Sequence, residues 1–303
     1  MKSAQLKALR RGFTLVELLA VIVIIGILAS MALYAASVAW VAAKNGSIAM
    51  DIKQLETDLQ SYYSKFQSYP PDLVIPPSAS QAFLNTRQQA IRSHLTKLAP
   101  RYTQGMPLLP DTPLVAGVDP QQARTNIAAE ALVFFLGGYS KPANVVGSTK
   151  LLGFRADPAN PFVQSAGQLS TSGGWKKGTV GFDETRLVDL DGDGWYEYLP
   201  RYCNIPYAYF NAKTYMNPSL ASAPRCEWPG TLGGVAVPYF SDNTQEKFMN
   251  AKTFQIIAAG QDSIFSSGEP NIKRMFPSGA GYTTEDNDNL TNFAERTLKD
   301  SMP

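Results

Sequence analysis

Residues 12–19 read Gly-Phe-Thr-Leu-Val-Glu-Leu-Leu, and they lead into an apolar stretch that ends near Ala43. Glu17 is a lone carboxylate near the start of a segment whose composition otherwise suits a lipid bilayer. An ionisable group inside a bilayer costs about 2.5–3.5 kcal/mol on insertion scales, so it indicates a function and a charged partner. A cut after Gly12 would free the α-amine of Phe13 and place a positive charge at the same depth as Glu17. This ion pair is the central expectation from the sequence.

The charges on either side of the stretch predict that it crosses a membrane once. Residues 18–43 are uncharged, and Lys44 closes the run. A helix over this range is about 39 Å long, which is enough to cross the hydrocarbon core. The segment before it contains cations and no acidic residue, which predicts a cytoplasmic N-terminus and an exported remainder. These cations are Lys2, Lys7, Arg10 and Arg11.

The basic leader, the glycine, the Phe-Thr-Leu-Val-Glu sequence and the long apolar helix together resemble type IV pilins and type II secretion pseudopilins. The resemblance is close over residues 11–28. It implies that residues 1–12 are a prepilin leader, that a prepilin peptidase cleaves between Gly12 and Phe13, and that Phe13 is then N-methylated. It also implies that Glu17 is the family's fifth-position glutamate. The chain departs from many members at Tyr34, where they have a proline that kinks the helix.

Two other interpretations compete for this N-terminus. An ordinary secretory signal cleaved near residues 35–37 has an apolar core of about 7–15 residues, which is shorter than this stretch, and it has no use for Glu17. A plain signal anchor that holds an enzyme outside the cell is the second alternative.

The helix is predicted to continue beyond the membrane. Apolar residues recur at steps of three and four from Ile48 to Phe66, with polar and charged residues between them, which is typical of an amphipathic helix. Pro70-Pro71 ends it. We therefore expect one helix over residues 13–66, transmembrane over about 13–43, whose far end packs against a globular domain. The expected core positions are Ile48, Ile52, Leu55, Leu59, Tyr62 and Phe66.

Residues 67–303 are predicted to form that domain. A helix over 80–99 begins at a Ser80 cap, and a second begins at Asp119-Pro120 and ends at Gly137-Gly138. Strand-like runs follow, so the fold class is α+β: a long N-terminal helix on a pilin-like domain with a mainly antiparallel sheet. Stretches rich in Gly, Ser and Pro predict large loop insertions at 140–180 and 211–232. The strand-like runs are 187–189, 195–199, 207–210, 235–240 and 254–258.

Composition limits the choice of partners. The formal net charge is only +2, so nucleic acid is not indicated as a partner. The two cysteines, Cys203 and Cys226, both follow the membrane span and are expected in a compartment where disulfides persist. A bridge between them would contribute about 3 kcal/mol in the chain-entropy model, and it is preferred here over two buried free thiols.

An acidic motif at residues 189–197 predicts a calcium site. It reads Asp-Leu-Asp-Gly-Asp-Gly-Trp-Tyr-Glu, and its spacing wraps carboxylates around one ion while glycine permits the sharp turn. Pro200 stands where an EF-hand has its bidentate glutamate, so the motif resembles the shorter Asp-x-Asp-Gly-Asp-Gly loops that bind calcium between strands. A solvated turn is the alternative. The predicted ligands are Asp189, Asp191, Asp193 and Glu197.

A second acidic cluster lies near the C-terminus. Residues 254–262 read as a strand that enters a turn, and residues 285–293 follow with several acidic positions. Together they are similar to the calcium-binding C-terminal loop of the major pseudopilin of type II secretion, although Asn289 stands where the family has its final aspartate. Residues 204–209 also resemble a strand of that family. An acidic surface loop is the alternative. The candidate ligands of this second calcium site are Asp262, Asp286 and Asp288.

The sequence does not indicate an enzyme. His94 is its one histidine, and it is predicted on the helix face away from the apolar stripe. The common nucleophile, zinc-protease and phosphate-loop motifs are not found in the sequence. The resemblance implies the expected function, a non-catalytic, structural filament subunit, most specifically a type II secretion pseudopilin with a role in protein secretion. The alternative is a type IV pilus subunit or minor tip component whose large domain mediates adhesion or binds a substrate or DNA.

The resemblance also implies partners and a location. The expected partners are other copies of the chain, related pilin-like subunits, the prepilin peptidase and an inner-membrane assembly platform. The expected location is the inner membrane, with a single pass and a periplasmic or extracellular C-terminal domain, and then the filament after assembly.

Overall fold

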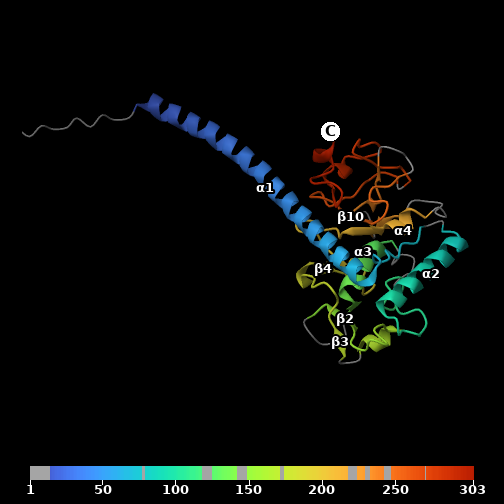
Figure 1. Ribbon diagram of the computed structural model, residues 1–303. Coiled ribbons are helices and arrows are strands. Elements are labelled where there is room, and N and C mark those ends of the chain that lie inside the picture. The colour runs from blue at the N-terminus through green and yellow to red at the C-terminus, as the bar shows by residue number, and fades with distance from the viewer. Residues whose placement is uncertain are drawn as a thin grey trace, which may run out of the picture. The chain divides into compact units, whose positions relative to one another are not determined.

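The computed structural model describes residues 14–76, 79–117, 125–141, 149–170, 174–217, 224–228, 233–241, 247–269 and 271–303. The chain divides into two compact units, Met1–Lys44 and Asn45–Pro303 (Figure 1). Among the expected features, the Gly12–Phe13 cleavage site and the Asp119-Pro120 helix start lie outside the described residues.

Helix α1 (Leu15–Phe66) is a single element of 52 residues. It passes through Tyr34 without interruption, so the chain forms one helix where many pilin-like proteins have a proline kink. Its first half belongs to the N-terminal unit and presents large apolar side chains, from Leu15 to Val41, to the surroundings. The helix is long and apolar enough to cross a membrane.

The second half of α1 forms part of the globular core. Ile48, Ile52, Leu55, Leu59 and Tyr62 are buried, and Phe66 packs against them partly exposed, which confirms the predicted stripe. The helix ends where Gln67 adopts a left-handed φ of 52°.

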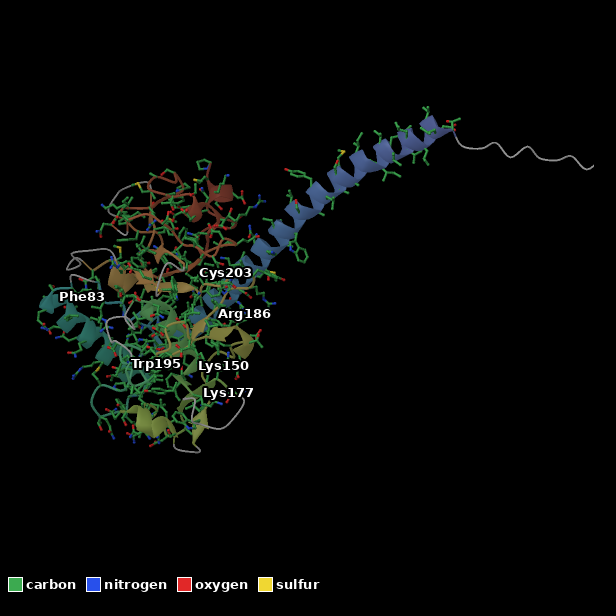
Figure 2. All side chains as sticks on the ribbon, turned by 180° about the vertical axis from the view of Figure 1, so that it is seen from behind. Phe83, Lys150, Lys177, Arg186, Trp195 and Cys203 are labelled. Atoms are coloured by element: carbon green, nitrogen blue, oxygen red, sulfur yellow. The ribbon has the colours of Figure 1, made fainter. Side chains whose placement is uncertain are left out.

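Asp51 ties the polar side of α1 to the globular domain. Its carboxylate accepts a hydrogen bond of 2.7 Å from Arg186, a residue labelled in Figure 2, and lies 3.5 Å from Arg201. The Arg186 contact is mostly buried, so water screens it less than an exposed ion pair. The amphipathic half of α1 is therefore held by apolar packing on one side and by charge beside it.

Three further helices lie in the globular unit. Helix α2 (Gln81–Leu98) begins at Ser80, whose hydroxyl accepts a hydrogen bond from the Phe83 backbone, as the sequence predicts. Helix α3 (Ile127–Gly137) is buried along its whole length, and α4 (Ala212–Tyr215) is a single short turn. Helix α3 contacts strands β5 (Glu197–Tyr198), β6 (Ala208–Asn211) and β7 (Cys226–Glu227), so it lies at the centre of the domain.

The strands are short. The three-stranded sheet β12-β10-β6 is antiparallel, with Phe254 opposite Asn211 and Ile257 opposite Thr291. A second antiparallel sheet has the order β1-β2-β3, and the pairs β4-β5 and β7-β8 are antiparallel, whereas β9 and β11 are parallel. The α+β class is therefore confirmed. The strands are β1 (Tyr139–Ser140), β2 (Leu151–Arg155), β3 (Trp175–Lys176), β4 (Leu187–Val188), β5 (Glu197–Tyr198), β6 (Ala208–Asn211), β7 (Cys226–Glu227), β8 (Val235–Ala236), β9 (Phe240–Ser241), β10 (Phe254–Ala258), β11 (Met275–Phe276) and β12 (Leu290–Thr291).

Two expectations from the sequence are corrected. The predicted Cys203–Cys226 disulfide is not formed, and both thiols are buried and free. They lie in different surroundings: the Cys203 thiol donates a hydrogen bond to the Ile205 carbonyl, whereas Cys226 lies in β7, which contacts α3.

The expectation of a surface histidine is also wrong. His94 is buried, its Nε2 is 2.7 Å from the Tyr62 hydroxyl, and its ring packs edge-on against Phe135. Helix α2 therefore uses a wider buried face than its aliphatic residues alone indicate. Burial lowers the pKa of His94 to about 3, with Lys213 and Lys97 adding to the shift.

Candidate functional site

The first candidate site is the N-terminus of α1, where Glu17 and Thr14 bond to each other. The Thr14 backbone N–H and hydroxyl donate to Glu17 Oε2 at 2.8 and 2.9 Å, and the Glu17 N–H lies 3.2 Å from the Thr14 hydroxyl oxygen. This reciprocal arrangement is a capping box, in which two side chains satisfy backbone groups that the first helical turn leaves without partners.

The capping box adds a local role for Glu17 that the sequence analysis missed. The signal was present as Thr-x-x-Glu before an apolar run. The bonds turn the carboxylate toward Thr14, the residue that follows Phe13 in the chain, and a negative charge is favourable at a helix N-terminus. The carboxylate therefore lies at the end of the helix next to the expected cleavage site.

The second candidate site is the acidic loop between β4 and β5. These two strands pair antiparallel, with Leu187 opposite Tyr198, so residues 189–196 close a tight connection between them. Asp189 accepts from the Gly194 N–H, Asp191 from the Asp193 N–H, and Asp193 from the Trp195 N–H. Each of these aspartates therefore uses one oxygen to shape the loop and keeps the other for a further contact.

A glutamate from α3 joins this loop. Glu130 lies on the buried helix α3 and is 1% exposed. One ligand oxygen each from Glu130, Asp191 and Asp193 lie within 4.8 Å of one another. Glu130 lies 59 positions before Asp189 in the chain, inside an almost wholly apolar run, so no local spacing connects it to the acidic motif. That lone carboxylate in a buried helix was the signal that could have found it.

Several oxygens of this group have no hydrogen-bond partner. Both carboxylate oxygens of Glu130 are buried without one, as is one oxygen each of Asp191 and Asp193. Two more buried oxygens also have no hydrogen-bond partner: Oδ1 of Asp189, on the same loop, and Oδ1 of Asn126, just before α3. Buried polar atoms are nearly always hydrogen-bonded in folded proteins, so this concentration of unpartnered oxygens in one place calls for a ligand.

Without a bound cation, burial and mutual repulsion disfavour the charged form of these carboxylates. Burial raises the pKa of Glu130 well above its ordinary value, and the negative charges of the three loop aspartates and of Glu197 in β5 raise it further. Burial and neighbouring carboxylates also raise the pKa of Asp189 and of Asp193, while backbone hydrogen bonds oppose the shift. The group needs either protons or a cation.

Glu197, the fourth predicted ligand, makes different contacts. Its Oε1 accepts a hydrogen bond of 2.7 Å from the Asn126 side chain, and its Oε2 accepts one of 3.2 Å from the Leu190 backbone. Glu197 is fully buried, and burial raises its pKa, with Asp191 adding to the shift. It therefore links the loop to the residue that precedes α3.

The C-terminal acidic residues are arranged around protein donors. Asp286 is buried, lies 3.3 Å from Arg274, and accepts hydrogen bonds from Tyr239 and Thr283. Asp288 accepts from the backbone of Gln261 and of Asp262. Burial raises the pKa of Asp262 to about 6. Within the described ranges, Glu130, Asp191 and Asp193 are the acidic group whose oxygens converge, and Asp262, Asp286 and Asp288 are not part of it.

Comparison with known proteins assigns the first of these sites to a family. The model of the prokaryotic N-terminal methylation motif matches residues 7–33. Together with the long apolar helix α1, this match is consistent with a type IV pilin-like N-terminus, and the motif implies methylation, membrane anchoring and assembly into filaments. No curated protein and no solved structure matches the chain.

Proposed function

We propose that this chain is a structural subunit of a pilus-like filament, most specifically a type II secretion pseudopilin without catalytic activity of its own. The observation that supports it most is the methylation motif at residues 7–33, followed directly by a helix able to cross a membrane. In this proposal the prepilin peptidase removes residues 1–12, Phe13 is N-methylated, and the subunit stays anchored in the inner membrane until it is assembled.

The orientation follows from charge. Cations cluster before the span, and Lys44 lies just after it, so the leader stays in the cytoplasm and the unit Asn45–Pro303 faces the periplasm. An inner-membrane platform then extracts the subunit into the filament, where the apolar first half of α1 exchanges lipid for the helices of other subunits. The large exposed side chains along this half supply the contact area for that exchange.

Glu17 sets the register of assembly in this mechanism. The Thr14 donors both bond Oε2, so the carboxylate is held at the helix end. In the low-dielectric interior of a helix bundle, the Glu17 carboxylate of an incoming subunit pairs with the Phe13 amine of its neighbour. A misaligned subunit leaves one of these charges buried without a partner, and such a loss is strongly destabilising.

The choice of a secretion pseudopilin rests on the C-terminal resemblance. Strand β10 and strand β12, which correspond to the two parts of that resemblance, pair in one sheet. Deletion of the gene in the native host distinguishes the alternatives. A pseudopilin mutant retains exoproteins in the cell, whereas a mutant in a pilus subunit or tip adhesin secretes normally and loses surface filaments or adhesion.

Substitutions at Glu17 test the assembly step. Glu17→Ala removes both the charge and the capping acceptor, whereas Glu17→Gln keeps a capping side chain and removes the charge. Glu56→Ala is the matched control, because Glu56 lies on the same helix beyond the membrane in an ion pair with Lys53. Each full-length variant is expressed in the native host, and the sheared filament fraction is quantified beside the membrane-retained subunit.

We expect both Glu17 variants to be cleaved and to be lost from the filament fraction, and the Glu56 variant to assemble normally. Filaments from Glu17→Gln at the wild-type level would show that Glu17 acts only as a helix cap, which contradicts the proposed ion pair. Normal filaments from Glu17→Ala would contradict any assembly role for this residue.

A further inference from the structure

We propose that Glu130 of α3 and the aspartates Asp191 and Asp193 of the β4–β5 loop bind one calcium ion inside the globular unit. Their ligand oxygens lie within 4.8 Å of one another and come from two elements far apart in the sequence. The proposal rests on these residues alone and stands or falls independently of filament assembly.

The donor set fits calcium by its chemistry. Calcium takes six to eight oxygen ligands in flexible geometry, whereas zinc and copper favour nitrogen and sulfur. Glu130 can bind through both of its oxygens, and Asp191 and Asp193 each keep one oxygen that no donor uses. The unpartnered oxygens of Asp189 and Asn126 lie on the same two segments and are available to complete the shell.

Glu130 is the observation that separates this site from an ordinary acidic turn. A loop of aspartates and glycines often lies on the surface with water around its charges. Here a glutamate that is 1% exposed, with neither oxygen hydrogen-bonded, faces the loop from a helix buried along its whole length. Such a carboxylate is costly to bury unless a partner compensates its charge.

The loop is already folded into the shape that an ion requires. Gly192 and Gly194 adopt φ values of 74° and 98°, which other residues rarely take, and the three backbone bonds to the aspartates fix the turn. Asp191 is half-buried and gives an ion access from outside. Bound calcium would fasten the β4–β5 loop to α3, which contacts the central strands.

Calcium binding is tested on the full-length protein in detergent, after treatment with a chelator. Thermal unfolding is recorded in chelator, in calcium and in magnesium. Calcium at about 100 times its dissociation constant should raise Tm by about 5–10 °C. Magnesium at the same concentration should do less, because it demands strict octahedral geometry and gives up water reluctantly.

Terbium luminescence reports on the location of the ion. Trp195, which is labelled in Figure 2, is buried, and its backbone N–H donates a hydrogen bond to Asp193. Its ring packs against Phe134, which lies one turn after Glu130 on α3. Excitation of this tryptophan should therefore sensitise a terbium ion bound in the site, and added calcium should remove the signal.

Two ligand variants and two control variants assign the ligands. Glu130→Gln and Asp191→Asn each remove one charged ligand and should weaken calcium by about 100-fold or more, since even loss of an outer-shell partner costs about 10–100-fold. Asp191→Asn is the variant more certain to fold, because the Asp191 side chain is only half-buried. Asp288→Asn changes the C-terminal cluster, and Asp157→Asn changes an exposed turn; both should keep the full response.

Three outcomes would overturn the proposal. In the first, Tm is the same in calcium and in chelator for the wild type, which means that the carboxylates share protons instead of an ion. In the second, calcium stabilises Glu130→Gln and Asp191→Asn as much as the wild type. In the third, the response is lost in Asp288→Asn and kept in Asp191→Asn, which places the ion in the C-terminal cluster.

Discussion

The side-chain amide of Asn126 donates a hydrogen bond of 2.7 Å to Glu197 Oε1, joining the residue before α3 to strand β5 across 71 positions of sequence. Both residues are fully buried. The bond gives one oxygen of Glu197 a donor in a region with several other acidic groups. It also holds the start of α3 close to the loop whose aspartates face Glu130.

This bond predicts that Asn126→Ala destabilises the protein. Leaving a buried acceptor without its hydrogen bond costs about 1–3 kcal/mol, and this substitution removes the donor to Glu197 Oε1. The free energy of unfolding should be measured by denaturant titration in chelator, so that no ion contributes. Asn85→Ala, at an exposed position of α2, is the control and should change stability by less than about 0.5 kcal/mol. Equal stability of the two variants would show that the Asn126–Glu197 bond contributes nothing.

His94 predicts a loss of stability in mild acid. Its folded pKa, about 3, lies below its unfolded pKa of about 6.5, so the unfolded chain takes up the proton first. Stability from the neutral histidine is therefore present above pH 6.5 and decreases as pH falls toward 3. Between pH 7.5 and 5.5 the loss is about 1.4 kcal/mol.

The variant His94→Gln isolates this effect. Other titrating groups, such as the buried Asp72, act in wild type and variant alike, so the difference in unfolding free energy between the two proteins reports on His94. The difference should narrow as pH falls from 7.5 to 5.5. A difference that is constant over this range means that His94 keeps its ordinary pKa.

The free thiols predict a specific labelling pattern. Cys203 and Cys226 are both buried, and burial raises the pKa of each thiol, so neither should react with an alkylating reagent in the native protein. Unfolding in denaturant without any reductant should expose both, and intact mass should show two added groups. A chain that takes up label only after reduction has the disulfide that the sequence predicted and the structure lacks.

The Arg274–Asp286 pair predicts a structural role for the C-terminal cluster. Both side chains are about 1% exposed, and breaking such a pair leaves a buried charge uncompensated at a cost of about 3–5 kcal/mol. Asp286→Asn should therefore unfold at markedly lower denaturant concentration than Asp262→Asn, because Asp262 is exposed. Similar denaturation midpoints for the two variants would mean that another negatively charged group pairs with Arg274 when the Asp286 charge is removed.

Local patterns in the sequence predicted the helices well. The spacing of Ile48 to Phe66 set the buried face of α1, and Ser80 marked the start of α2, because helix periodicity and capping depend on residues only three or four positions apart. Strands were harder: the predicted run 195–199 shrinks to Glu197–Tyr198, since Asp193 and Trp195 belong to the turn.

Contacts between segments far apart in the chain could not be predicted from the sequence. The apolar run around Glu130 indicates that this carboxylate needs a partner, but it does not indicate that the partner is the loop at 189–197. Likewise, nothing near Tyr62 indicates that it bonds His94. The predicted disulfide is wrong for the same reason. The cellular compartment and the number of cysteines indicate which residues are able to pair, but they do not indicate where the fold places them. The Thr14–Glu17 capping box was local and could have been predicted.

The central claim is that this chain enters a filament only after a cut that creates a charged amine beside Glu17. The most direct measurement is the intact mass and N-terminal sequence of the protein purified from its native host. We predict a chain that begins at Phe13, with one methyl group on its amine. A protein that still begins at Met1, or that begins at any residue other than Phe13, would contradict it.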